Sequence, residues 1–65
     1  MNSVKSIRLN RKSQEVDCFD GTTKLCSIDG EKLNIKADND IVNFIKEQGS
    51  VELAISHIKT LSQQQ

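Results

Sequence analysis

From residue 4 to residue 37, apolar residues recur at every second position in short runs separated by clusters of polar residues. This spacing is typical of antiparallel strands that bury one face, because successive side chains of a strand point to opposite sides of the sheet. The intervening segments are rich in Asn, Asp, Gly and Ser, which favour turns. The pattern therefore predicts four strands, at residues 4–9, 15–19, 24–28 and 32–37.

The register between these strands can also be predicted, since side chains that face one core must meet across neighbouring strands. Pairing Leu9 with Val16 also sets Ile7 opposite Cys18, and the next turn then sets Cys18 opposite Cys26. One register thus gathers nine residues on a single face of the sheet. They are Ile7, Leu9, Val16, Cys18, Cys26, Ile28, Leu33, Ile35 and Ala37.

Three apolar residues fall on the opposite, mostly charged face of the predicted sheet: Val4, Phe19 and Leu25. The same register sets Phe19 directly across from Leu25. Two interpretations remain open. The pair is ordinary surface cover, since much of any protein surface is apolar, or it belongs to a patch that docks a partner or a second copy of the chain.

After Ala37 the apolar spacing changes to that of helices. Asp38 or Asn39 is predicted to cap a first helix and Gly49 to end it, and Ser50 is predicted to cap a second helix. The inner side of the first helix is predicted to carry Ile41, Val42, Phe44 and Ile45. The inner stripe of the second is predicted to carry Val51, Ala54, Ile55, Ile58 and Leu61.

Together these segments predict an α+β fold, a four-stranded antiparallel meander followed by two C-terminal helices packed on one face of the sheet. Residues 1–62 form one small domain in this interpretation, and residues 63–65 form a polar tail. A chain of 65 residues buries only about 60% of the surface that it exposes when unfolded. We therefore expect a homo-oligomer, most simply a homodimer, to add stability.

The charges are balanced overall but unevenly distributed. Nine basic and nine acidic residues give no net charge, which argues against a protein dedicated to gripping a phosphate backbone. Four positive charges and no acid nevertheless lie in the first twelve residues, namely Lys5, Arg8, Arg11 and Lys12. These side chains either protect a solvated strand edge against aggregation or bind nucleic acid or an anion such as a nucleotide.

Residues 47–61, EQGSVELAISHIKTL, resemble the turn and second helix of a helix-turn-helix, whose second helix enters the DNA major groove. The turn is short, polar Gln48 stands before the glycine, and Val51 would face the DNA. The second helix also offers only Lys59 as a cation and contains no arginine. A helical hairpin that covers the sheet is the preferred interpretation, and DNA binding is the alternative.

Cys18 and Cys26 are predicted to be cross-strand neighbours. Two thiols are favoured over a disulfide, because the cytosol is reducing and cysteine is often buried. A metal site would need further ligands, and His57, the chain's one histidine, is predicted on the outer side of the second helix. We predict no metal and no cofactor.

Neither catalysis nor membrane insertion is predicted. The three glycines are isolated turn residues and form no phosphate-binding loop, and no nucleophile, base and orienting group can be brought together. The sequence lacks both an apolar run of the roughly 18 residues that a membrane span needs and the apolar core of a secretion signal. The expected protein is cytoplasmic and is not an enzyme.

By elimination, the sequence predicts a small interaction protein that binds and inhibits or modulates a partner protein, of a kind common in phages and mobile elements. The predicted partner-binding residues are Val4, Phe19 and Leu25 on the sheet and Leu53 and His57 on the second helix. Two alternatives remain: nucleic-acid binding, and an oligomer that sequesters an anionic small molecule such as a nucleotide.

Overall fold

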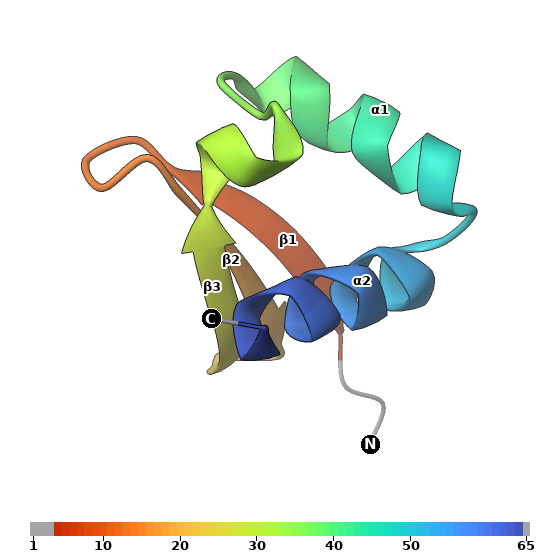
Figure 1. Cartoon of the computed structure of the whole chain (residues 1–65). Helices are drawn as coiled ribbons and strands as arrows, with labels where there is room; N and C mark the ends of the chain where they lie inside the picture. The colour runs from red at the N-terminus through yellow and green to blue at the C-terminus, as the bar shows by residue number, and fades with distance from the viewer. Residues whose placement is uncertain (1–3, 65) are drawn as a thin grey trace.

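The computed structural model describes residues 4–64 as a three-stranded sheet with two helices on one of its faces (Figure 1). The strands are β1 (Lys5–Asn10), β2 (Glu15–Asp20) and β3 (Thr23–Asp29), in the antiparallel order β1-β2-β3. A short 3₁₀ helix, η1 (Gly30–Leu33), leads to helices α1 (Asp38–Gln48) and α2 (Val51–Gln63). The predicted α+β class and the order of strands before helices are confirmed. Helix α2 continues one residue into the segment predicted as a tail.

The predicted register is correct over the core-facing part of the sheet. Leu9 lies opposite Val16, Ile7 lies opposite Cys18, and Cys18 lies opposite Cys26. The agreement has a simple cause. A slip of one residue would turn every apolar side chain of a strand toward solvent, so the period-two pattern admits one pairing.

The predicted pair of Phe19 and Leu25 is wrong, because a β-bulge follows Cys18 and places Lys24 opposite Phe19. A bulge sets two residues of one strand against one of its neighbour and shifts the alternation of faces. The Lys24 ammonium accordingly lies 3.7 Å from the Asp17 carboxylate. Leu25 is turned to the helix-covered side, where it packs against the core.

The fourth strand predicted at 32–37 does not form, and η1 takes the first part of its place. The Asp29 carboxylate accepts a hydrogen bond from the Glu31 N–H at 3.0 Å, which caps η1 and replaces the expected hairpin turn. The Ile35 N–H then donates to the Gly30 carbonyl at 2.8 Å. Ile35 is nevertheless only 2% exposed, so the alternation identified its burial correctly although its backbone is not a strand.

Helix α1 starts with a different cap from the predicted one. The helix begins at Asp38 itself, and neither Asp38 nor Asn39 caps it. The Asp40 carboxylate instead reaches back to accept hydrogen bonds from the N–H groups of Lys36 at 2.8 Å and Ala37 at 3.1 Å. A carboxylate in the first turn also interacts favourably with the positive end of the helix dipole.

The connection between the helices is as predicted. Gly49 ends α1 with a φ of 107°, a conformation that side-chain-bearing residues rarely adopt. The Ser50 hydroxyl accepts a hydrogen bond from the Leu53 N–H at 3.1 Å and so caps α2. The two helices therefore follow each other with almost no linker and pack on the same sheet.

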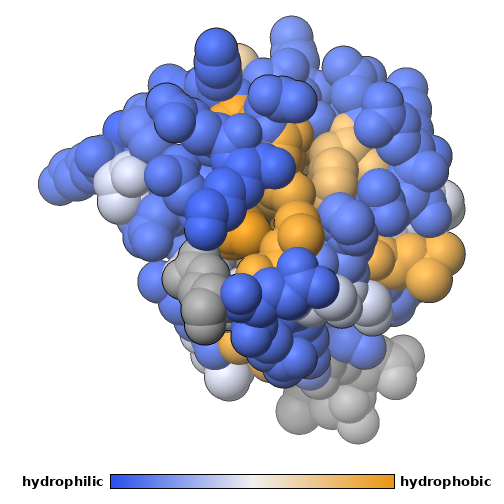
Figure 2. Space-filling view, in the orientation of Figure 1, coloured by the Kyte–Doolittle hydropathy of each residue, from blue (hydrophilic) through white to orange (hydrophobic). Residues whose placement is uncertain are grey.

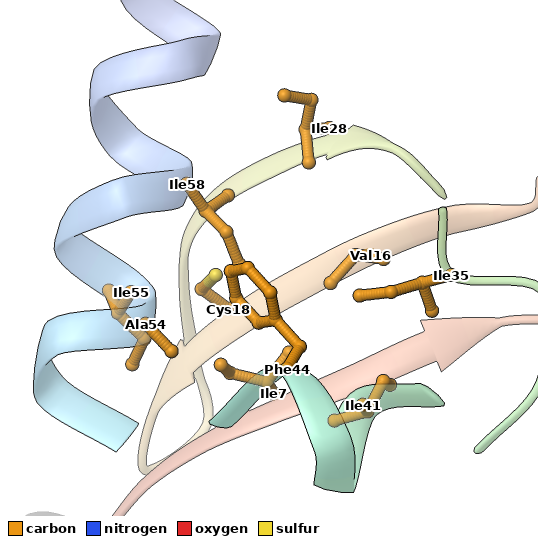
Figure 3. Packing of buried hydrophobic residues seen from close by; sticks show 10 residues of the cluster. All are labelled: Ile7, Val16, Cys18, Ile28, Ile35, Ile41, Phe44, Ala54, Ile55 and Ile58. Atoms are coloured by element: carbon orange, nitrogen blue, oxygen red, sulfur yellow. The ribbon is translucent and has the colours of Figure 1, made fainter. Parts of the chain in front are cut away.

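The core lies between the sheet and the two helices (Figure 3). Phe44 of α1 and Ile58 of α2 point toward Cys18 on the central strand. Burying one such side chain contributes about 1.5–3 kcal/mol. Among residues 4–64, the buried apolar residues are Ile7, Val16, Cys18, Ile28, Ile35, Ile41, Phe44, Ala54, Ile55 and Ile58.

Candidate partner-binding groove

The five predicted partner-binding residues do not form one patch. Phe19 lies half-buried on the open face of the sheet, whereas Leu25 packs on the other side against the core. Val4, just before β1, is 70% exposed. Leu53, 56% exposed, and His57 lie on α2, with the His57 ring 5.9 Å from the Phe44 ring between centroids.

The open face of the sheet is largely occupied by its own charged side chains. The Arg8 guanidinium lies over the Phe19 ring, 5.8 Å from its centroid, an arrangement that cation–π attraction favours. Asp17 is only 6% exposed, and its nearest cation is Lys24. Phe19 is therefore less available for docking than the sequence suggested.

The four basic residues of the first hairpin are mostly matched by acids of the same chain. Two of them, on β1, lie directly opposite an acid of β2 in the strand register, and a third forms a hydrogen-bonded ion pair at 2.8 Å. Such pairs reduce the positive potential that a phosphate backbone would meet. Lys5 lies opposite Asp20 and Arg8 opposite Asp17, whereas Arg11 is ion-paired with Asp38, which leaves Lys12.

A groove of about 520 Å³ runs between the outer edge of β1 and helix α1. Its floor is apolar, formed by Ile7 and Leu9 from the strand and Ile41 and Val42 from the helix. Val42 is 52% exposed, so the groove is open to solvent beside this residue. Its rim is polar and consists of Arg8, Arg11 and Asp38.

The backbone of β1 has hydrogen-bonding groups to offer at this groove. The Gly21 N–H donates to the Val4 carbonyl at 2.7 Å, which makes this pair a hydrogen-bonded one. In an antiparallel ladder such pairs alternate with non-bonded ones, so the N–H and C=O groups of Lys5, Ile7 and Leu9 point away from β2. Within residues 4–64, no backbone hydrogen bond to these groups comes from outside the sheet.

Two further hollows are more polar. One, of about 290 Å³, lies beside α1 and includes the acids Asp40 and Glu47. The other, of about 370 Å³, lies near η1 and includes Asp29 and Glu31. Neither combines an apolar floor with a free strand edge, so the β1 groove is the stronger candidate for binding a polypeptide.

The sequence pattern did not reveal this groove, because it predicted that Val42 faces the core. At 100° per residue, the four apolar residues of α1 span about 160° of the helix surface, and Val42 stands at the end of that arc. A three-stranded sheet does not cover so wide a stripe. The width of the stripe was the signal that could have placed Val42 at the margin.

Apolar surface is accessible elsewhere as well. Figure 2 shows it at the centre of the face that carries the helices, surrounded by polar side chains. Several residues that pack against the core are only partly buried. They include Leu9, Leu33, Ile45, Val51 and Leu61.

The two cysteines are free thiols. Cys18 is fully buried, and this burial raises its pKa to about 12, with a side-chain hydrogen bond to Cys26 acting in the same direction. A thiol with this pKa stays protonated at neutral pH and is a poor nucleophile. Cys26 is only half-buried, so the expectation of two buried thiols holds fully for Cys18 alone.

Comparison with protein-family models, curated proteins and solved structures finds no match for this chain. Across residues 4–64, no helix has the length and apolar character needed to cross a membrane. The groove and its surroundings are therefore the basis for a functional proposal.

Proposed function

We propose that this chain is a small, non-enzymatic interaction protein that binds a partner protein through the β1 groove and so inhibits or modulates it. The observation that supports the proposal is the free edge of β1 beside an apolar floor that includes exposed Val42. Exposed apolar surface rimmed by polar residues marks interaction sites in soluble proteins.

The nucleic-acid alternative is less well supported. Two of the four cations of the first hairpin lie opposite an acid of β2, and a third is ion-paired with Asp38. The inner stripe of α2 is buried against the rest of the domain, and among its charged side chains Glu52 offsets Lys59. The small-anion alternative also has little support, because Asp38 already holds Arg11 at the groove rim.

A cytoplasmic location is part of the proposal, since two free cysteines that face each other across the sheet suit a reducing compartment. An origin in a phage or mobile element is also part of it, on the ground of small size alone. Neither affects the mechanism proposed for the groove.

The proposal can be tested by affinity capture from a lysate of cells that express the protein. The baits are the wild-type chain, a Val42→Asp variant and a control, Thr60→Asp, at an exposed position of α2. Circular dichroism verifies that each bait folds. We expect one protein to be retained by wild type and control and lost with Val42→Asp. Retention of the same proteins by all three baits would contradict the proposed site.

Self-association remains a separate expectation. Its test is the molar mass from light scattering with refractive-index detection, because the chain has no Trp or Tyr. We expect a dimer that Leu53→Asp dissociates and Val42→Asp leaves intact. A monomer at every concentration would contradict this expectation without affecting the proposed groove.

A further inference from the structure

We propose that the β1 edge recognises an extended segment of the partner as a fourth strand, and that this segment alternates apolar and acidic residues. The inference rests on the proposed function and adds to it the conformation and chemistry of the bound segment. An added strand gains affinity from main-chain hydrogen bonds and specificity from contacts of alternate side chains.

The backbone of β1 is suited to this role. Lys5, Ile7 and Leu9 present N–H and C=O groups on the side away from β2, and β1 runs through its six residues without a bulge. A neighbouring strand lies about 4.8 Å away in the hydrogen-bonding direction. It would therefore lie alongside β1, at the margin of the groove.

Alternate side chains of that strand would meet two different environments, because successive residues of a strand face opposite sides. On the helix-covered side they would meet the groove floor, where Ile41 and half-exposed Val42 offer apolar contacts. On the open side they would meet the guanidinium of Arg8. Apolar residues suit the first set of positions and acidic residues suit the second.

The charge of the groove favours an acidic segment over a second copy of β1. Arg8 and Arg11 outnumber Asp38 on the rim, Lys5 begins the strand, and Lys12 lies in the turn that follows it. Pairing β1 with β1 would bring both basic sets together, and basic residues on an edge oppose such self-pairing. The Arg8 guanidinium, which forms no ion pair among the described residues, attracts an acidic strand.

The probe is a fluorescent peptide of the length of β1 in which valine and glutamate alternate, and its binding is followed by anisotropy. Three controls accompany it. One peptide has lysine in place of glutamate. Another is N-methylated at alternate amides and cannot donate hydrogen bonds on the β1 side. The third control is the Thr60→Asp protein, which is altered at an exposed position of α2 away from the groove.

We expect the valine–glutamate peptide to bind wild type and Thr60→Asp equally. Losing several main-chain hydrogen bonds should weaken binding of the N-methylated peptide by more than about tenfold. Arg8→Ala and Val42→Asp should each weaken the unmodified peptide, and the lysine peptide should not bind. Equal affinity for the methylated and unmodified peptides would overturn strand addition, and equal affinity for the lysine peptide would overturn the acidic preference.

Failure of this inference can be told apart from failure of the proposed function. If partner capture depends on Val42 but no peptide binds, or the chain instead pairs β1 with β1, strand addition to an acidic segment is wrong and the groove keeps its role. If partner capture is insensitive to Val42→Asp, the groove itself is wrong.

Discussion

The two edges of this small sheet differ in construction. The β1 edge is regular, basic and bordered by an apolar groove. The β3 edge carries a bulge at Leu25 and runs directly into η1 after Asp29. A bulge and a charged end both make an edge a poor template for another strand. We infer that the backbone of β3 blocks its edge. The edge of β1 stays open, and its positive charges oppose pairing with a second copy of β1.

The largest expected effect is on the free energy of unfolding. It distinguishes α2, which packs mainly on β3, from α1, which lies beside β1. Ile58 of α2 is fully buried, so Ile58→Ala should destabilise the fold by about 2–5 kcal/mol. Val42→Ala, at a half-exposed position beside β1, should stay within about 0.5 kcal/mol of wild type. Urea denaturation followed by circular dichroism measures both, and equal losses would contradict the distinction.

Gly30 tests how β3 is brought to an end. A Cβ at this position would lie 2.5 Å from the Ile35 carbonyl oxygen and 3.0 Å from that of Gln14, and both are backbone atoms that cannot move freely. Gly30→Ala should therefore cost about 1–3 kcal/mol or more. In the matched control, Gly21→Asn, the residue replaced has open space around it and a φ of 64° that Asn tolerates. A Gly30→Ala variant as stable as the control would show that η1 does not depend on this close approach.

Alkaline pH tests the packing of β2 against β3. The pKa of Cys18 is raised to about 12 from an ordinary 9.0, so between these values the unfolded chain has lost a proton that the folded chain retains. Stability should be fully present below pH 9 and then fall by about 1.4 kcal/mol for each pH unit above it. Comparison with Cys18→Ala isolates this contribution from that of the lysines. Identical pH profiles for the two proteins would contradict the raised pKa.

The smallest expected effect concerns the ion pair at the groove rim. Arg11 and Asp38 have side chains that are 78% and 64% exposed, and such surface pairs contribute only about 0–1 kcal/mol. Asp38→Asn should hardly change the urea midpoint. It should strengthen binding of the valine–glutamate peptide, because it frees Arg11. Weaker peptide binding would mean that the pair positions Arg11 for recognition.

Much of the fold could be predicted because two strong patterns determine it. Alternation set the pairing of Leu9 with Val16 and of Cys18 with Cys26, and helical spacing set the inner stripe of α2. The bulge at Leu25 has no local signal, since Leu25 is apolar and suits either face of the sheet. A bulge arises from how the ends of two strands fit together, which no single segment encodes.

The candidate site was harder to predict than the fold. Val42 looked like a core residue because its neighbours Ile41 and Phe44 are core residues. Its exposure depends on how α1 lies against the edge of β1, which is a tertiary property. The basic residues were recognised from the sequence, but their acidic partners became visible only once Asp17, Asp20 and Asp38 were placed beside them.

Amide hydrogen exchange, resolved by residue and recorded with and without the valine–glutamate peptide, tests the difference between the edges most directly. We expect the amides of Lys5, Ile7 and Leu9 to exchange rapidly in the free protein and to become protected when the peptide is added. The amide of Ser27 on the β3 edge should not change. Protection that moves to Ser27, or that is already present at Ile7 without the peptide, would contradict the claim that β1 is the open edge.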